Sequence, residues 1–277
     1  MGNHKTCSIC KKNNNIVNTV VLENGAHFEC SKKSGVYLCK KIDMTHLENV
    51  LEDQSKSFIQ YKEIEYYSDN TYKNKETVEE KINNRSLAIP KTLNQFTKTI
   101  KKIHMNLFKD TGVSNGGSFR SVSESVYIDQ GTHAFEGALS NEIIPKLKII
   151  WEHLLEPFYI RFENKRPSTV DMICLSSDFI VIFFRIHPFR DGNGRTGRLF
   201  VKLLLHNYNY DLKIQSSAKT ARKYIAALRY AHRKFRTTDM SILNSHHRAI
   251  MHKYIYIYFS KFIFDSSFIP TSDEDPR

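Results

Sequence analysis

The chain has 277 residues, a formal net charge of +12 and a pI near 9.4, and it is 40% hydrophobic and 25% charged. These values are typical of a soluble globular protein and exclude collagen-like and wholly disordered chains. The longest apolar stretch, residues 179–186, contains Arg185 and is too short to span a bilayer. The positive charge admits anionic partners such as nucleotides, nucleic acid or acidic proteins, although composition alone favours a solvated lysine-rich face.

The first segment, residues 1–42, contains four of the five cysteines. Cys7-x-x-Cys10 has the spacing of a zinc-ligand pair, and Cys30 with Cys39, more loosely spaced, could complete a tetrahedral site. Ordinary reduced cysteines are the alternative, because no secretory signal opens the chain and a reducing, cytoplasmic location fits its composition.

A second interpretation of the same segment starts from its first six residues. Met1-Gly2-Asn3-His4-Lys5-Thr6 fits the N-myristoylation pattern, and Cys7 and Cys10 would then be sites for palmitoylation. The chain would in that case be peripheral to a membrane, for example in a host cell into which it is delivered. Zinc and acylation therefore both stay open.

Residues 43–89 are expected to hold a short helix, opened by a capping box at Thr45 and Glu48, and then a linker. The linker is predicted for residues 66–85, which are polar and lack a clear apolar period. After Pro90, apolar residues recur at spacings of three and four and predict an amphipathic helix. These residues are Leu93, Phe96, Ile100, Ile103 and Leu107.

Residues 112–128 change character and predict a short hairpin or flap, because the turn signal Gly116-Gly117 precedes aromatic and β-branched residues. A helix is then expected from Ser140. It would bury Ile143, Ile144, Leu147, Ile150, Trp151 and Leu154.

Ser168 with Asp171 predicts the cap of a further helix, which is apolar nearly all round and ends at Pro188. A helix of this kind lies at the centre of a bundle. Three more helices are expected, near Arg195, around 224–232 and around 242–258. The chain is therefore predicted to be all-α, with a main domain at 90–260 that carries one short β-hairpin, and with a C-terminal tail at 261–277.

The chemistry-bearing segment joins the central helix to the next one. Gly192-Asn193-Gly194 tolerates positive φ, so its backbone N–H groups can converge at a helix N-terminus, which favours an anion. Arg195 and Arg198 are three residues apart, share a helix face and could bind one polyphosphate.

Two further side chains in this segment complete a set for phosphate transfer. Asp191 directly precedes the glycine turn, and a carboxylate beside bound phosphates is a common Mg²⁺ ligand. His187 has an ordinary pKa suited to accept a proton from a hydroxyl near neutral pH. A base, a metal ligand, an anion site and two cations are the groups that such chemistry needs.

The string His187-x-Phe189-x-Asp191-Gly192-Asn193-Gly194-Arg195-x-x-Arg198 resembles the full motif of the Fic (Fido-domain) family. The resemblance extends over roughly residues 90–250. Gly117-Ser118-Phe119-Arg120 resembles the target-binding flap of that family, and Tyr224 lies in a segment similar to its helix near the adenine pocket.

The resemblance implies a compact helical fold that transfers AMP from Mg·ATP to a Ser, Thr or Tyr hydroxyl of a target protein. His187 would be the base and Asp191 would bind Mg²⁺, while the flap would align the target by strand addition. The phosphates would be bound by Gly192, Asn193, Gly194, Arg195 and Arg198, and Phe189 would anchor the loop.

Other functions stay open beside this one. An enzyme of the same fold could transfer UMP, phosphocholine or phosphate, and a non-catalytic zinc- and nucleic-acid-binding module is a further alternative. The intact residues 192–195 disfavour phosphate transfer, and His187 with Asp191 disfavours an inactive site.

Regulation is a separate question. Thr132–Gly137 matches the inhibitory string Ser/Thr-x-x-x-Glu-Gly/Asn of the family, but Gly131 and Gly137 argue against the helix that this role requires. Inhibition by a separate antitoxin-like partner, or no inhibition, stays open.

Overall fold

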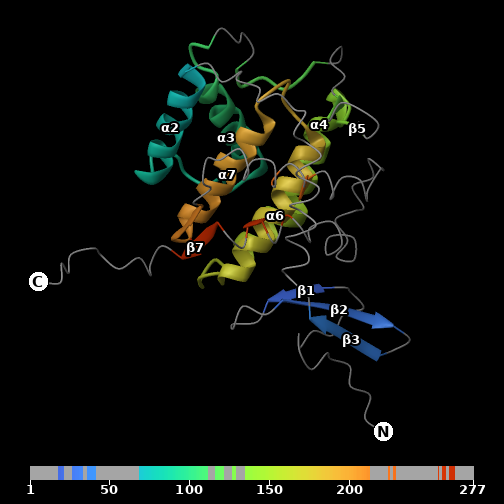
Figure 1. Cartoon of the computed structure of the whole chain (residues 1–277). Coiled ribbons are helices and arrows are strands. Elements are labelled where there is room, and N and C mark those ends of the chain that lie inside the picture. The colour runs from blue at the N-terminus through green and yellow to red at the C-terminus, as the bar shows by residue number, and fades with distance from the viewer. Residues whose placement is uncertain are drawn as a thin grey trace, which may run out of the picture. The chain divides into compact units, whose positions relative to one another are not determined.

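The computed structural model describes residues 18–21, 27–33, 36–41, 69–111, 116–121, 127–128, 135–212, 224, 227–228, 255, 258–259 and 262–265. The chain divides into two compact units (Figure 1). The first unit comprises residues 1–62 with 216–258, and the second comprises residues 63–215 with 259–277. Because strand β7 lies at Ile263–Asp265 and pairs with β6 at Tyr210–Leu212, the predicted C-terminal tail contributes to the second unit.

The first unit contains a three-stranded antiparallel sheet in the order β1-β2-β3, formed by Asn18–Val21, His27–Lys33 and Val36–Lys41. This sheet was not predicted. Its register places Cys30 directly opposite Cys39. The helices expected at 224–232 and 242–258 are helical at their few described positions, and the rings of Tyr224 and Tyr258 contact each other at 5.2 Å. The predicted cap at Thr45 lies outside the described residues.

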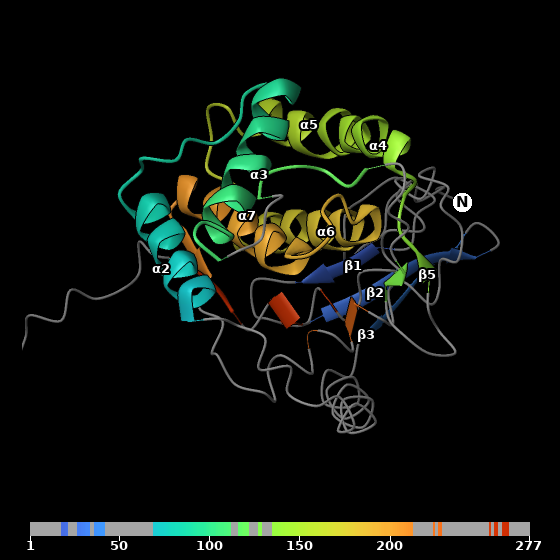
Figure 2. The ribbon, with the colours of Figure 1, turned by 90° about the horizontal axis from the view of Figure 1, so that it is seen from above.

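The second unit is built from helices, and no helix among the described residues combines the length and apolarity that crossing a membrane requires. Its helices are α2 at Asp69–Asn83, α3 at Leu93–Leu107, α4 at Ile143–Ile150, α5 at Glu156–Arg161, α6 at Thr169–Ile186 and α7 at Asn193–Asn207. A 3-10 turn, η1 at Ser140–Glu142, and a π-helical segment, η2 at Trp151–Leu155, flank α4. Helices α6 and α7 lie side by side, with α3 against α7 and α4 against α6 (Figure 2).

The core of the second unit forms where α3, α6 and α7 meet. Phe96, Phe179 and Phe200, one from each helix, are fully buried, and their ring centroids lie 4.7–6.2 Å apart. Such aromatic contacts add to the free energy gained by burial. The prediction that the apolar helix ending at Ile186 occupies the centre of a bundle is therefore confirmed.

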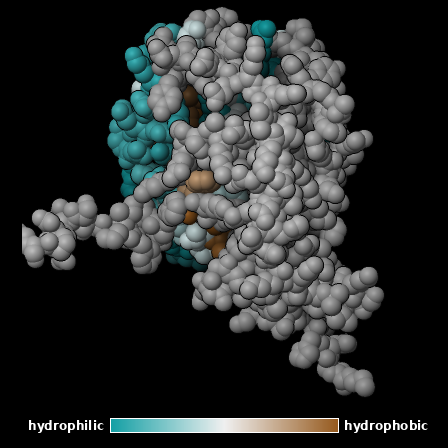
Figure 3. Space-filling view, in the orientation of Figure 1, coloured by the Kyte–Doolittle hydropathy of each residue, from teal (hydrophilic) through white to brown (hydrophobic). Residues whose placement is uncertain are grey.

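The linker predicted for residues 66–85 is wrong over α2, which is helical from Asp69. Two apolar residues four positions apart, Val78 and Ile82, are fully buried and suffice to dock the helix. The Asn74 amide also donates hydrogen bonds to the carbonyls of Leu107 and Lys109, 3.2 and 2.6 Å away, at the end of α3. The remaining face of α2 is hydrophilic in Figure 3, and its many Lys, Glu and Asn residues conceal the apolar period in the sequence.

The helix expected from Ser140 is confirmed with one correction. After the 3-10 turn it continues through η2 into α5, and every predicted core residue is buried except Ile144, which is 48% exposed. Ile144 follows Ile143 directly, and a 100° step along the helix carries it off the narrow buried stripe.

The hairpin lies further along the chain than predicted. Tyr127–Ile128, strand β4, pairs with Phe135–Glu136, strand β5, whereas Gly117–Arg120 has no regular structure. The described part of the string Thr132–Gly137 is thus extended rather than helical, in agreement with the expectation from its flanking glycines.

The cap of α6 provides a test of the fold. The Ser168 hydroxyl accepts a hydrogen bond from Asp171 N at 3.2 Å, and Ser168 N donates to the Asp171 carboxylate at 3.0 Å. Ser168→Ala should lower the free energy of unfolding by about 1 kcal/mol, because it leaves a helix-end N–H without its acceptor. Urea titration measures this change. Thr77→Ala on the exposed face of α2 is the control, with a change below about 0.5 kcal/mol, and equal losses in both variants would contradict the capping role.

Candidate active site

His187 occupies the turn that ends α6. Its backbone is left-handed, with φ 52° and ψ 59°, and its N–H donates to Phe183 O at 3.1 Å as the last helical hydrogen bond. Pro188 follows and cannot continue the helix. The His187 ring meets the ring of Phe184 edge-on at 5.5 Å. The imidazole is therefore held at the rim of a buried helix end.

Arg120 supports this turn. Its buried guanidinium donates to the carbonyl of His187 at 2.7 Å and to the carbonyls of Ala138 and Ile186. Its own N–H donates to Pro188 O at 3.0 Å. A cation at a helix C-terminus satisfies carbonyls that have no partner within the helix. Arg120 was expected in the target-binding flap, which would add a strand to the target. Its side chain instead binds the carbonyls of the His187 turn.

Burial of the ring lowers the pKa of His187 to about 4, and the charge of Arg120 acts in the same direction. The backbone of Phe184 and the charge of Asp191 oppose this shift. Nδ1 is buried and reaches no partner at regular hydrogen-bond geometry among the described residues. The imidazole is therefore neutral at pH 7, which is the form that can accept a proton.

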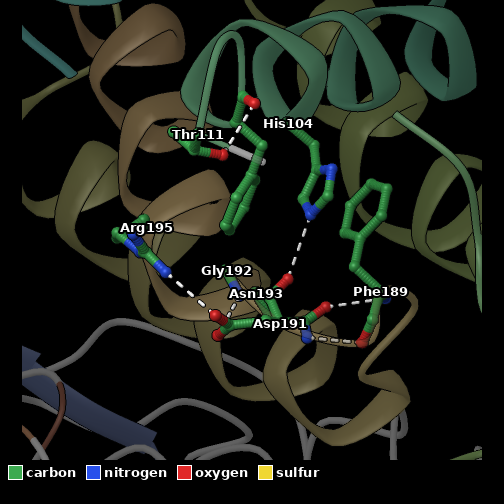
Figure 4. Close-up of polar contacts among 8 residues, drawn as sticks. His104, Thr111, Phe189, Asp191, Gly192, Asn193 and Arg195 are labelled. Carbon is green, nitrogen blue, oxygen red and sulfur yellow. Dashed lines mark hydrogen bonds and ion pairs between the residues drawn. The ribbon is translucent and has the colours of Figure 1, made fainter. Parts of the chain in front are cut away.

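The side chain of Asn193 closes the motif loop from inside. Its Oδ1 accepts from Phe189 N at 2.9 Å, and its Nδ2 donates to Phe189 O at 2.8 Å (Figure 4). Both residues are buried. The sequence predicts that Asn193 binds phosphate, but its amide group is used within the loop. Only its backbone N–H, at the start of α7, remains for an anion.

Gly192 turns the chain into α7. Its φ is 72°, and a Cβ at this position would collide with the ring of Phe108, so a side chain is excluded on both grounds. Thr196 N donates to Gly192 O at 2.8 Å and begins the helical hydrogen bonds. The backbone N–H groups before Thr196 have no acceptor within the helix, and this gives the helix start its affinity for anions.

Charged side chains surround this helix start. The Asp191 carboxylate is 74% exposed and lies 3.3 Å from the guanidinium of Arg195 (Figure 4). This guanidinium also lies over the Phe108 ring, 4.9 Å from its centroid. A Cβ on Gly194 would lie 3.4 Å from Nη1 of Arg198, so the Arg198 side chain extends along the same end of α7. The predicted metal ligand, turn and cations are thus brought together.

Sequence reasoning assigned no role to one central residue, His104. It is 3% exposed, and burial lowers the pKa of its ring to about 4. Its Nε2 lies 3.0 Å from Asp191 O, and its Nδ1 accepts from Gly117 N at 2.8 Å. The available signal was a histidine on the apolar stripe of the helix at 93–107, in line with Ile100 and Leu107.

The other predicted residues differ in what the structure shows of them. Ser118 is exposed, and Phe119 packs on Phe189 at 5.2 Å, whereas Tyr224 belongs to the first unit. Cys7 and Cys10 lie outside the described residues. Over the described ranges, no three His, Cys, Asp or Glu side chains gather in a way that could hold a metal ion.

Comparison with known proteins agrees with this geometry. Residues 93–205 match the model of the Fic/DOC family. A Fido domain-containing protein of Dictyostelium discoideum is 29% identical over 131 residues, which cover 45% of this chain and 91% of that protein. Residues 93–205 are therefore a domain of the Fic/DOC family. A probable protein adenylyltransferase of Aquifex aeolicus is 36% identical over 67 residues. These residues cover 24% of this chain and 20% of that protein.

A solved structure resembles the fold. A Fic domain-containing signaling protein from Bacteroides thetaiotaomicron superposes with a TM-score of 0.52 at 21% identity and covers 79% of each chain. The predicted helical Fic fold is confirmed.

The lowered pKa values of His104 and His187 predict a pH dependence of stability. Folding lowers the pKa of His104 and His187 from 6.5 to about 4, so between these values the unfolded chain binds protons that the folded chain does not. The free energy of unfolding should therefore fall as the pH drops from 6.5 to about 4, and these two rings should add no further loss below that range.

Replacing one ring should reduce this slope. His104→Gln should lower it by about 1.4 kcal/mol per pH unit, the value for one proton, whatever its effect on stability at pH 7. Denaturant titrations at several pH values between 4.5 and 6.5 measure the slope. A variant with the wild-type slope would mean that this ring titrates normally.

Proposed function

We propose that this chain is a protein adenylyltransferase, which transfers AMP from ATP to a Ser, Thr or Tyr hydroxyl of a target protein. The observation that carries the proposal is the juxtaposition within one loop of a neutral, half-buried imidazole and a glycine-turned helix start bearing Asp191, Arg195 and Arg198. The name of the Aquifex aeolicus relative agrees with AMP as the transferred group.

The proposed reaction is a displacement at the α-phosphorus. His187 accepts the proton of the target hydroxyl, whose oxygen forms a bond to the α-phosphorus. The bond from that phosphorus to the oxygen bridging the α- and β-phosphates breaks, and pyrophosphate leaves. The charge of Asp191 favours the imidazolium that forms, because it raises the pKa of His187 against the larger effect of burial.

The residues at the start of α7 fit a magnesium-bound triphosphate. Asp191 offers an exposed carboxylate directly before the anion-binding turn, and a magnesium ion bound there would neutralise phosphate charge. Arg195 pairs with this carboxylate at 3.3 Å, so a contact between Arg195 and the phosphates would require its side chain to move. Arg198 would stabilise the charge of the leaving pyrophosphate from the same end of the helix.

The target would dock at the strand pair β4–β5. Two strands leave backbone groups unpaired at their outer edges, where an extended peptide can add as a further strand. We also propose that an antitoxin-like inhibitory partner could occupy the site in place of the target.

Label transfer tests the proposed activity. Wild-type chain incubated with Mg²⁺, α-³²P-ATP and a cell lysate should label protein, and His187→Ala should lower the rate by at least about 100-fold, because it removes the base. His153→Ala, an exposed histidine in η2, is the matched control and should label as wild type does. Parallel reactions contain labelled UTP, CDP-choline or γ-³²P-ATP. Labelling from one of these donors alone would assign the transferred group to an alternative, and no labelling from any donor would contradict a transferase.

We also propose that Cys7, Cys10, Cys30 and Cys39 bind one zinc ion. Directly opposite residues of an antiparallel pair are neighbours, so Cys30 and Cys39 are close despite their separation in sequence. Cys7-x-x-Cys10 has the spacing of a ligand pair.

Metal analysis tests the zinc site. Protein purified under reducing conditions should contain about one zinc per chain, as a site of four thiolates holds a single ion. Cys30→Ser should lose most of it, whereas Cys174→Ser in α6 should retain it. Protein without zinc whose intact mass, after expression in eukaryotic cells, includes a myristoyl group would favour acylation.

A further inference from the structure

The ring of His104 packs against two aromatic side chains. Its ring stacks on Phe189 with a centroid distance of 3.9 Å and an interplanar angle of 8°, and it contacts Phe108 at 4.6 Å. Only 3% of the residue is exposed. Because rotation out of this stack would open the core, the two ring nitrogens point in fixed directions.

The hydrogen bonds determine where the proton of this ring lies. A backbone N–H can only donate, so Nδ1, which lies 2.8 Å from Gly117 N, must be an acceptor without a proton. In a neutral imidazole the other nitrogen then carries the proton. Nε2–H therefore donates to Asp191 O at 3.0 Å (Figure 4). One ring thus makes two bonds of opposite polarity.

These bonds reach two parts of the site that are far apart in sequence. Asp191 precedes Gly192, whose left-handed backbone starts the anion-binding turn. Gly117 begins the segment 117–120, which is tied at its other end by the bond from Arg120 N to Pro188 O at 3.0 Å. A Cβ on Gly117 would lie 3.0 Å from Met105 Cβ, so this segment also packs closely against α3.

We propose that His104 is a positioning residue that orients the nucleotide-binding turn through Nε2 and, independently, the flap segment 117–120 through Nδ1. The inference rests on the proposed transfer at His187, because that reaction gives the turn and the segment 117–120 their roles. Loss of the Asp191 bond should weaken nucleotide binding. Loss of the Gly117 bond should instead slow transfer, because the segment that leads to Arg120 and the His187 turn is no longer held.

Two substitutions separate the bonds. The amide of glutamine reaches the position of Nε2 and can donate to Asp191 O, whereas the amide of asparagine reaches the position of Nδ1 and its oxygen can accept from Gly117 N. His104→Gln should bind a magnesium complex of a non-hydrolysable ATP analogue within about threefold of wild type. Its labelling rate at saturating ATP should be about tenfold lower.

His104→Asn should show the opposite pattern. Its affinity for the analogue should fall about tenfold and its KM for ATP should rise about tenfold. Its labelling rate at saturating ATP should stay within about threefold of wild type. Calorimetry gives the affinity, and labelling of lysate protein gives KM and kcat. His153→Gln is the matched control and should change neither quantity.

The wild-type protein offers a test that needs no variant. At pH 7 the imidazole nitrogen resonances of His104 should show a proton on Nε2 and none on Nδ1, and the amide proton of Gly117 should be shifted downfield by its nitrogen acceptor. A proton on Nδ1 would overturn the proposal.

The variants can overturn it independently. Equal losses of affinity and rate in His104→Gln and His104→Asn would mean that the ring only fills space. If the wild-type chain binds the analogue but labels nothing, the proposed transfer fails, whereas the affinities and the resonances still decide the role of His104.

Discussion

The carbonyl groups at the end of α6 need donors inside the protein, and the buried guanidinium of Arg120 provides them. It binds the carbonyls of Ile186, His187 and Ala138, and its backbone N–H binds Pro188 O. Without this partner the carbonyl of His187 would lose its donor and the carbonyl of Ile186 would keep the bond from Ala138 N, and an unsatisfied carbonyl is unfavourable inside a protein. The left-handed turn at His187 depends on this arrangement, and the direction of the motif loop follows from it.

The motif loop is also stabilised by internal hydrogen bonds, and its backbone is held by the side chain of Asn193 rather than by its charged residues. Asn193 uses its amide to hold both backbone groups of Phe189, and Phe189 is buried against His104. The backbone is thereby fixed without the use of the arginines. Asp191 stays exposed at the start of α7. Such preorganisation matters for phosphoryl chemistry, in which catalysis consists mainly of positioning and neutralising charge.

Particular elements show how far local sequence patterns predict this fold. Helices α3 and α6 are evident because their apolar periods are long and α6 also has a capping box. Helix α2 escaped prediction, since among its described side chains Val78 and Ile82 are the buried apolar ones, and bonds such as those of Asn74 to the end of α3 add to its stability. Strand β5 lies beyond the predicted hairpin, because the pairing of two-residue strands is set by contacts with the rest of the chain rather than by propensity.

The sequence by itself determined the helical class, the central helix and the loop whose residue order indicates phosphate-transfer chemistry. Period, capping and glycine content are local properties, so they can be read without knowledge of contacts. Only the tertiary structure decided that Arg120 supports His187 and that His104 binds both Asp191 and Gly117. Arg120 and its partner His187 are 67 positions apart in the sequence, and His104 and its partner Asp191 are 87 positions apart. A separation of that length has no local signal, because it is set by how the helices pack.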